Sequence, residues 1–220
     1  LKMKNLALIA GKPMIAYAID AAKASGVFDK VVLNSDSHVF EKIAEEYECE
    51  FYLRPENLGK SSTKSDDVVL DFMQNYRGDI VVWVNPISPL QPPHEIREVV
   101  NYFLKNNLDS LITIKNEQVH CVLNNKPINF SLEGKFAQTQ ELTPIQPFVY
   151  SLMAWKTDTF LKAMKTKGRA ILHGKIGYYP VSKMSAIIIK TEEDLLLVDF
   201  IARSRKERTK ITYHSLAPPL

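Results

Sequence analysis

The sequence predicts an α/β fold with a doubly wound, mostly parallel sheet and a small β insertion. Apolar runs of strand length alternate with amphipathic helical stretches, and the connections between them are short. This alternation is typical of a parallel sheet that helices cover on both faces. It stops between Asn116 and Gln146, where short runs between turn residues indicate antiparallel strands. We therefore expect one domain over residues 1–220 with a β insertion at 116–146.

The chain opens with LKMKNLALIAGKP, a polar stretch that leads into a Gly-Lys-Pro loop. Pro13 suits the first turn of a helix, and Met14, Ala18 and Ala22 repeat at helical spacing until Gly26. Loops of this kind, between a strand and a helix, are where phosphates often bind. We therefore expect a helix over residues 13–26.

The order of strand and helix then occurs twice more. VVLNSDS (31–37) predicts a buried strand that runs into a polar loop, and HVFEKIAEEYE (38–48) predicts an amphipathic helix. EFYL (50–53) predicts a short strand, and SDDVVLDFMQNY (65–76) predicts a helix. Ser65 and the two acids after it are residues that a helix N-terminus prefers.

The most apolar strands follow. IVVWV (80–84) and SLITI (110–114) are continuous apolar runs, which predict buried core strands. Between them lie the loop NPISPLQPP (85–93), which holds four prolines, and the predicted helix HEIREVVNYFLKNN (94–107). Within the insertion, VHCVLNN, PINFSL and KFAQTQ predict short antiparallel strands.

Two helices are expected after the insertion. TDTFLKAMKTK (157–167) and TEEDLLLVDFIARS (191–204) both have helical spacing of apolar residues. Thr191 and Asp194 resemble a capping box, in which two side chains bond each other's backbone N–H groups.

The composition excludes several classes of protein. The formal net charge of +3 is too small to indicate a nucleic-acid partner. The longest apolar runs have strand length, which is too short to span a membrane. Cys49 and Cys121 show no pairing pattern, which is typical of a reducing compartment, so we expect a cytoplasmic protein.

Metal-ligand and nucleophile motifs are missing from the sequence. It has no HxxxH, CxxC or Gly-x-Ser-x-Gly pattern and no Walker lysine loop. The histidines form no ligand set at recognised spacing; they are His38, His94, His120, His173 and His214. We predict no metal site from these residues.

Four segments, in this order, carry a family resemblance: LKMKN…AGKP, LRPENLGK…S (53–65), VNPISPLQ (84–91) and IGYYPVSKMSAIIIKTEED (176–194). Together they resemble the acylneuraminate (CMP-sialic acid) cytidylyltransferases, and the chain is identified as a divergent member. The resemblance implies a Rossmann-like fold of the nucleotide-diphospho-sugar transferase type. It implies transfer of CMP from CTP to an acidic sugar, sialic acid or a related nonulosonic acid, with release of pyrophosphate. It also implies Mg²⁺ and a homodimer built through the 116–146 insertion.

The resemblance also implies site residues. Lys4 and Asn5 match the end of the family's nucleotide-binding loop, with Lys4 as the catalytic candidate. Arg54 matches an arginine near the base and phosphates, and Ser65 matches a small hydroxyl residue near the cytosine. The implied nucleotide-binding set is Lys4, Asn5, Arg54, Ser65, Asn85 and Ser88.

The family's first strand and most of its Gly-rich loop would lie before Leu1. A doubly wound sheet without its central first strand would leave two edges inside the core. We therefore expect about 15–20 further residues upstream, the length that a strand and loop of this kind need.

Some positions depart from the family pattern. Ile188 and Lys190 stand where the family has two metal-binding aspartates, and neither side chain is a ligand for Mg²⁺. Val149 and Tyr150 stand where it has a sugar-side Asn-Gly, and Gln91 where it has Arg. Three interpretations of these departures stay open. In the first, the Lys190 ammonium replaces the charge of the metal in a re-specialised transferase. In the second, the chain is a non-catalytic paralogue that binds a nucleotide or a partner. In the third, the register of the comparison is shifted, and the acids at 192–194 supply a carboxylate.

Overall fold

The computed structural model describes residues 3–207, and of residues 206–207 only the backbone. Its centre is a four-stranded sheet in the order β10-β6-β9-β5. β6 and β10 are parallel, while β9 is antiparallel to both β6 and β5, so that β5, β6 and β10 all run in one direction. The strands are β5 (Ile80–Val84), β6 (Ser110–Ile114), β9 (Phe148–Lys156) and β10 (Ile176–Pro180). This arrangement confirms the predicted α/β class.

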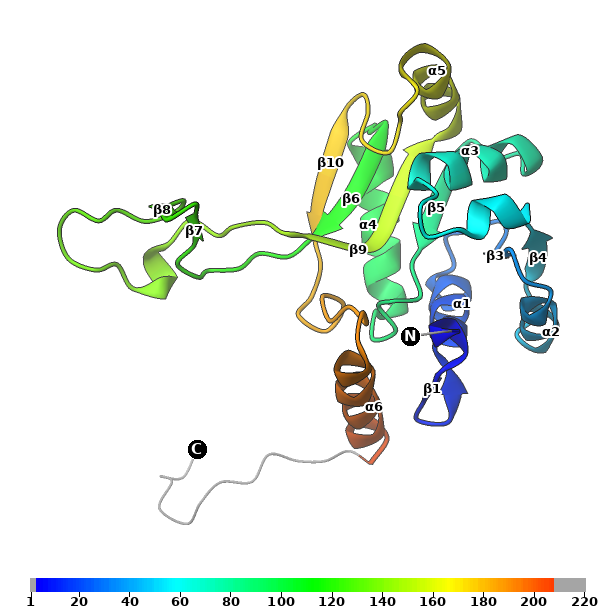
Figure 1. Ribbon diagram of the computed structural model, residues 1–220, viewed down its shortest axis with the longest axis horizontal. Helices are drawn as coiled ribbons and strands as arrows, with labels where there is room; N and C mark the ends of the chain where they lie inside the picture. The colour runs from blue at the N-terminus through cyan, green and yellow to red at the C-terminus, as the bar shows by residue number, and fades with distance from the viewer. Residues whose placement is uncertain (1–2, 208–220) are drawn as a thin grey trace.

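A second, two-stranded sheet lies beside it (Figure 1). β3 (Val32–Ser35) and β4 (Glu50–Leu53) are parallel, and α2 (Val39–Glu46) connects them. At the start of the chain, the turn η1 (Lys4–Leu6) precedes a small hairpin of β1 (Leu8–Ile9) and β2 (Lys12–Pro13). A further turn, η2 (Glu56–Gly59), follows β4.

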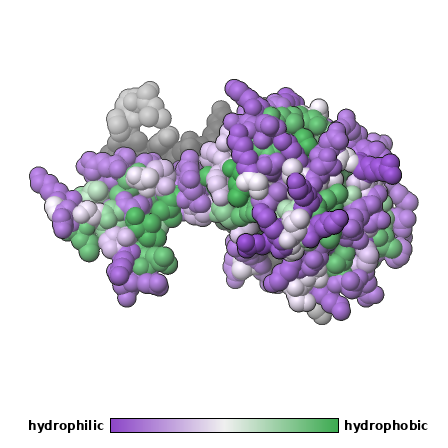
Figure 2. All heavy atoms as spheres, turned by 90° about the horizontal axis from the view of Figure 1, so that it is seen from above, coloured by the Kyte–Doolittle hydropathy of each residue, from purple (hydrophilic) through white to green (hydrophobic). Residues whose placement is uncertain are grey.

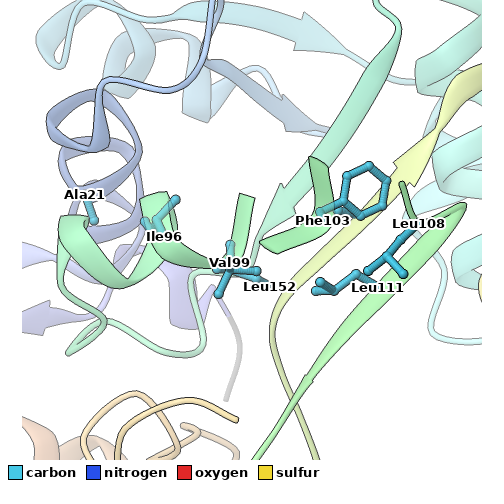
Figure 3. Close-up of a cluster of buried hydrophobic side chains, with 8 residues drawn as sticks. Ala21, Ile96, Val99, Phe103, Leu108, Leu111 and Leu152 are labelled. Atoms are coloured by element: carbon cyan, nitrogen blue, oxygen red, sulfur yellow. The ribbon is translucent and has the colours of Figure 1, made fainter. Parts of the chain in front are cut away.

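Helices cover both faces of the central sheet because β9 alternates its side chains between them. Leu152 and Ala154 pack with α4 (Pro93–Lys105) in a cluster that includes Phe103 (Figure 3). Met153 and Trp155 pack on the opposite face with α3 (Ser65–Asn75) and α5 (Thr157–Lys167). Successive strand residues point to opposite faces, so one strand contributes to two cores.

Helix α1 (Met14–Ser25) joins the two sheets. Ala21 belongs to the cluster on α4, whereas Ile15 and Ile19 pack with Leu33 of β3. Gly26 ends the helix with φ of 68°, a left-handed conformation that glycine adopts without strain.

The two apolar core strands differ in burial. All five residues of β6 are buried, as the sequence predicts. All five residues of β5 are only partly buried, so the prediction that this strand is fully buried is wrong. β5 is the edge strand of the four-stranded sheet, and along its outer edge none of the described strands pairs with it.

β9 is not among the strands predicted from the sequence. It is nine residues long and pairs with β5 and β6 along most of its length. Its apolar run resembles the others, and periodicity says nothing about the direction in which a strand is paired.

The insertion forms an arm that extends away from the sheet (Figures 1 and 2). Of the strands predicted within the insertion, only the two-residue β7 (Val122–Leu123) and β8 (Lys126–Pro127) form. The segment KFAQTQ ends instead in the turn η3 (Thr139–Glu141). The bridge between Glu117 and Ile145 closes the base of the arm. Its exposed apolar side chains are Val119, Val122, Leu123, Ile128, Leu132 and Phe136.

Helix α6 (Glu192–Glu207) begins with the predicted capping box. The N–H of Asp194 donates to Thr191 Oγ1 at 3.2 Å, and the N–H of Thr191 donates to Asp194 Oδ2 at 2.8 Å. Within residues 3–207, none of the helices has the length and apolar character needed to cross a bilayer.

Two neighbouring positions on α4 test the packing of the core. Phe103 is 1% exposed and Leu104 is 53% exposed. We expect Phe103→Ala to lower the free energy of unfolding by about 3–5 kcal/mol, because it leaves a cavity. Leu104→Ala, on the same helix, should change it by less than about 0.5 kcal/mol. Urea denaturation followed by circular dichroism measures both; equal losses would contradict the described orientation of α4.

Candidate functional site

The loops that follow β5, β6 and β10 leave the sheet at the same edge, the one formed by the carboxyl ends of the strands, because these three strands run in one direction (Figure 1). In open α/β sheets, ligands bind at the carboxyl ends of the strands. The segments at this edge are residues 85–92, the arm, and residues 181–190.

Lys4 joins the start of the chain to this edge. Its ammonium donates a hydrogen bond to the carbonyl of Ile189 at 3.2 Å. The N–H of Ile189 in turn donates to the carbonyl of Ile87 at 2.9 Å. Three segments that are distant in the sequence therefore meet at one place, and Lys190, whose side chain is exposed, is the residue that follows Ile189. Asn5, beside Lys4, has a buried Oδ1 for which no described residue supplies a donor.

The loop after β5 is held in a defined shape. The N–H of Asn85 donates to the carbonyl of Ser151 at 2.9 Å, and Asn85 Oδ1 accepts the N–H of Ile87 at 3.3 Å. Ser88 is buried, and its hydroxyl donates to the carbonyl of Ser185. The Ser88 side chain thus ties this loop to the segment before α6.

A buried polar cluster beneath the loop is absent from the predicted site. Gln91 Nε2 donates to Glu95 Oε2 at 3.1 Å and to Ser151 Oγ at 3.3 Å. Glu95 Oε1 accepts the N–H of Ser182 at 2.7 Å. Gln91 Oε1 is buried and has no donor among the described residues. The spacing of four between Gln91 and Glu95 is the one sequence signal for this cluster, since such residues face each other at the start of a helix.

Arg54 lies in a different surrounding, a cavity of about 700 Å³ between β4, α3 and the loop after β3. Its guanidinium pairs with Asp36 Oδ1 at 2.7 Å and donates to Asn34 at 3.2 Å, while Arg54 Nε is buried and has no acceptor among the described residues. In the same cavity, the Tyr52 hydroxyl donates to Asp71 at 2.8 Å. Burial, followed by the Asp71 carboxylate, raises the pKa of Tyr52 to about 12, so the phenol stays a neutral donor.

Ser65 is exposed and is the first residue of α3, where Lys64 precedes it. The next residue, Asp66, accepts the N–H groups of Ala170 and Ile171 at 2.5 and 3.0 Å. Hydrogen bonds therefore link the regions of Lys4, Asn85 and Ser88, whereas Arg54 lines a cavity to which none of the other predicted residues contributes.

Val149 and Tyr150, two of the positions that depart from the family pattern, lie where β9 begins. Val149 is buried, and Tyr150 is 44% exposed with φ of 61°. A left-handed backbone is uncommon for a bulky residue and strains it locally. The Tyr150 ring meets Phe148 edge-on, and Phe148 stacks on Tyr178 with 5.9 Å between ring centroids.

Several known proteins are similar to this chain. Residues 1–151 match the family model described as Cytidylyltransferase. An N-acylneuraminate cytidylyltransferase of Streptococcus agalactiae is 25% identical over 204 residues, which are 89% of this chain and 48% of that protein. The chain thus spans about half the length of that relative. Post-translational flagellin modification protein B of Campylobacter coli is 24% identical over 221 residues, which are 95% of this chain and 92% of that protein.

A shorter match and a solved structure agree with these. A CMP-N,N'-diacetyllegionaminic acid synthase of Legionella pneumophila is 32% identical over 103 residues, which are 44% of each chain. The structure of CMP:2-keto-3-deoxy-manno-octonic acid synthetase complexed with CTP has a TM-score of 0.67, with 14% identity and 93% of each chain covered. At this identity the likeness concerns the fold alone. Because the family model covers more than half of the residues, the resemblance seen in the sequence is confirmed and the chain belongs to the cytidylyltransferase family.

Proposed function

We propose that this protein transfers the cytidylyl group from CTP to an acidic sugar, sialic acid or a related nonulosonic acid. Relatives named for such sugars support the choice of acceptor. The observation that carries the proposal is the junction at the carboxyl ends of the strands, where Ile189 bonds both the Lys4 ammonium and the Ile87 carbonyl of the loop after β5. A cationic side chain held at this edge suits a nucleoside triphosphate.

The reaction needs position and positive charge more than covalent chemistry. A sugar hydroxyl attacks the α-phosphorus of CTP, a new O–P bond forms, the bond to the bridging oxygen breaks, and pyrophosphate leaves. The hydroxyl proton passes to a base or to solvent. Charge grows on the phosphate oxygens during this step, so cationic donors that are already in place lower the barrier. In this proposal Lys4 is such a donor.

A second candidate function is nucleotide binding without turnover. It is favoured by the commitment of the Ser88 hydroxyl to Ser185, which withdraws one predicted ligand from the nucleotide. Both candidates require CTP binding, and only the transferase releases pyrophosphate.

We assign the protein to the cytoplasm. Cys49 and Cys121 are both unpaired. Free thiols are typical of a reducing compartment.

The first functional test measures pyrophosphate release from CTP with a panel of nonulosonic acids, using the full-length protein. We expect release with at least one acid. Lys4→Ala should lower kcat by about a hundredfold, which is typical when one electrostatic donor is removed. Lys42→Ala, an exposed lysine on α2, should leave the rate unchanged. CTP binding without any release would favour the second candidate, and no binding would contradict both.

We further propose that the arm packs against a second copy of this chain. Leu132 and Phe136 are 79% and 76% exposed, although both are large apolar side chains. An isolated two-stranded hairpin is marginally stable, and β7 and β8 have two residues each, so the arm needs a surface to cover it. Two identical arms supply matching apolar surfaces in a symmetric dimer.

Light scattering tests this assembly. We expect the unmodified protein to be a dimer and the double variant Leu132→Asp with Phe136→Asp to be a monomer, because buried unpaired carboxylates are costly. Leu104→Asp places a single carboxylate on the exposed face of α4, away from the arm, and should stay dimeric. A monomeric unmodified protein at micromolar concentration would refute the proposal.

A further inference from the structure

We propose that Lys190 and Lys4 together hold the phosphates of CTP, and that their two ammonium groups supply the charge that a divalent cation would otherwise supply. This inference rests on the proposed function and concerns the same site. It predicts a cytidylyltransferase site whose nucleotide binding does not depend on Mg²⁺.

The backbone brings the two lysines together. Lys4 donates to the carbonyl of Ile189, and Lys190 is the next residue after that carbonyl. The Lys190 side chain is exposed, whereas its backbone N–H is fixed by Asp194 Oδ2 at 2.8 Å. The contact between the Ile189 N–H and the Ile87 carbonyl holds this segment against the loop after β5. Lys190 is therefore an exposed cation on a backbone that hydrogen bonds hold next to the candidate site.

Two carboxylates near this junction, those of Asp194 and Asp199, are already bonded to the protein. Asp194 Oδ2 accepts two backbone N–H groups, and the N–H of Thr191, followed by that of Lys190, keeps the pKa of Asp194 below its usual range. Asp199 accepts the N–H of Ala10 through one oxygen and pairs with Arg203 through the other. Residues 3–207 contain no cluster of three or more His, Cys, Asp or Glu side chains able to hold a metal ion. Mg²⁺ prefers several carboxylate oxygens at one place, and no such cluster lies beside Lys4 within residues 3–207.

Neither Lys4 nor Lys190 forms an ion pair with a carboxylate within residues 3–207, whereas Lys12 pairs with Asp20 and Arg54 pairs with Asp36. Two ammonium groups at one edge attract a polyphosphate and repel a second cation. Lysine binds phosphate as a point charge, so a pair of lysines suits the several oxygens of a triphosphate.

Calorimetry with CTP, once with Mg²⁺ and once with EDTA, tests the inference on the full-length protein. We expect the two Kd values to agree within about twofold. Lys190→Ala should weaken CTP binding about tenfold in both solutions, the loss typical of one charge-assisted contact. Its affinity for cytidine, which has no phosphate, should not change. The control is Lys42→Ala, an exposed lysine on α2, which should bind CTP as the unmodified protein does.

A second variant tests whether position 190 lies near the bound phosphates, by introducing carboxylates there. Ile188→Asp combined with Lys190→Asp puts two carboxylates at this edge, and we expect it to bind CTP at least about tenfold more tightly with Mg²⁺ than with EDTA. Strong Mg²⁺ dependence in the unmodified protein would overturn the inference, and so would a Lys190→Ala variant that binds CTP normally or a double variant without Mg²⁺ dependence. If the unmodified protein bound neither CTP nor cytidine, the proposed function would be refuted, and this inference with it.

Discussion

The pairing of β9 with both β5 and β6 is the interaction on which the rest of this structure depends. β5 and β6 are not neighbours in the sheet, and only their hydrogen bonds to the antiparallel strand β9 between them join them into one sheet. The same strand supplies alternate side chains to the cores on the two faces of the sheet. Trp155 of β9 is fully buried and its indole N–H donates to the Ile171 carbonyl at 2.8 Å, which also anchors the segment before β10.

The candidate site depends on β9 as well. The carbonyl of Ser151 accepts the N–H of Asn85, and the Ser151 hydroxyl contacts Thr113 of β6 at 3.0 Å and Gln91 at 3.3 Å. One residue of β9 therefore fixes the loop after β5 and the buried polar cluster beneath it. Buried polar groups are costly unless they are bonded, so this cluster has few alternative arrangements. The junction with Ile189 forms on a loop that is already rigid.

The arm is a consequence of the reversed strand. β6 and β9 are antiparallel neighbours, and the chain between them is an excursion that leaves and re-enters the sheet at the site edge. The register between β6 and β9 shifts between Ile112 and Ile114, next to the strained Tyr150. Irregular pairing of this kind bends a strand and directs it out of the sheet. The base of the arm and the candidate site are thus at the same end of the sheet.

The sequence by itself determined the fold class, the alternation of helices and strands before the insertion, and the capping of α6, because these follow from local periodicity and from residues three positions apart. The family resemblance also pointed to Lys4, Asn85 and Lys190 as residues of interest. Only the tertiary structure decided that β9 runs antiparallel, that Lys4 reaches Ile189, that the Ser88 hydroxyl faces Ser185, and that Arg54 pairs with Asp36 in a separate cavity. The tertiary structure also decided that Gln91 and Glu95 bond Ser151 and Ser182, and that β5 is only partly buried. Each depends on contacts between segments far apart in the chain, and local composition and spacing carry no information about which distant segments meet.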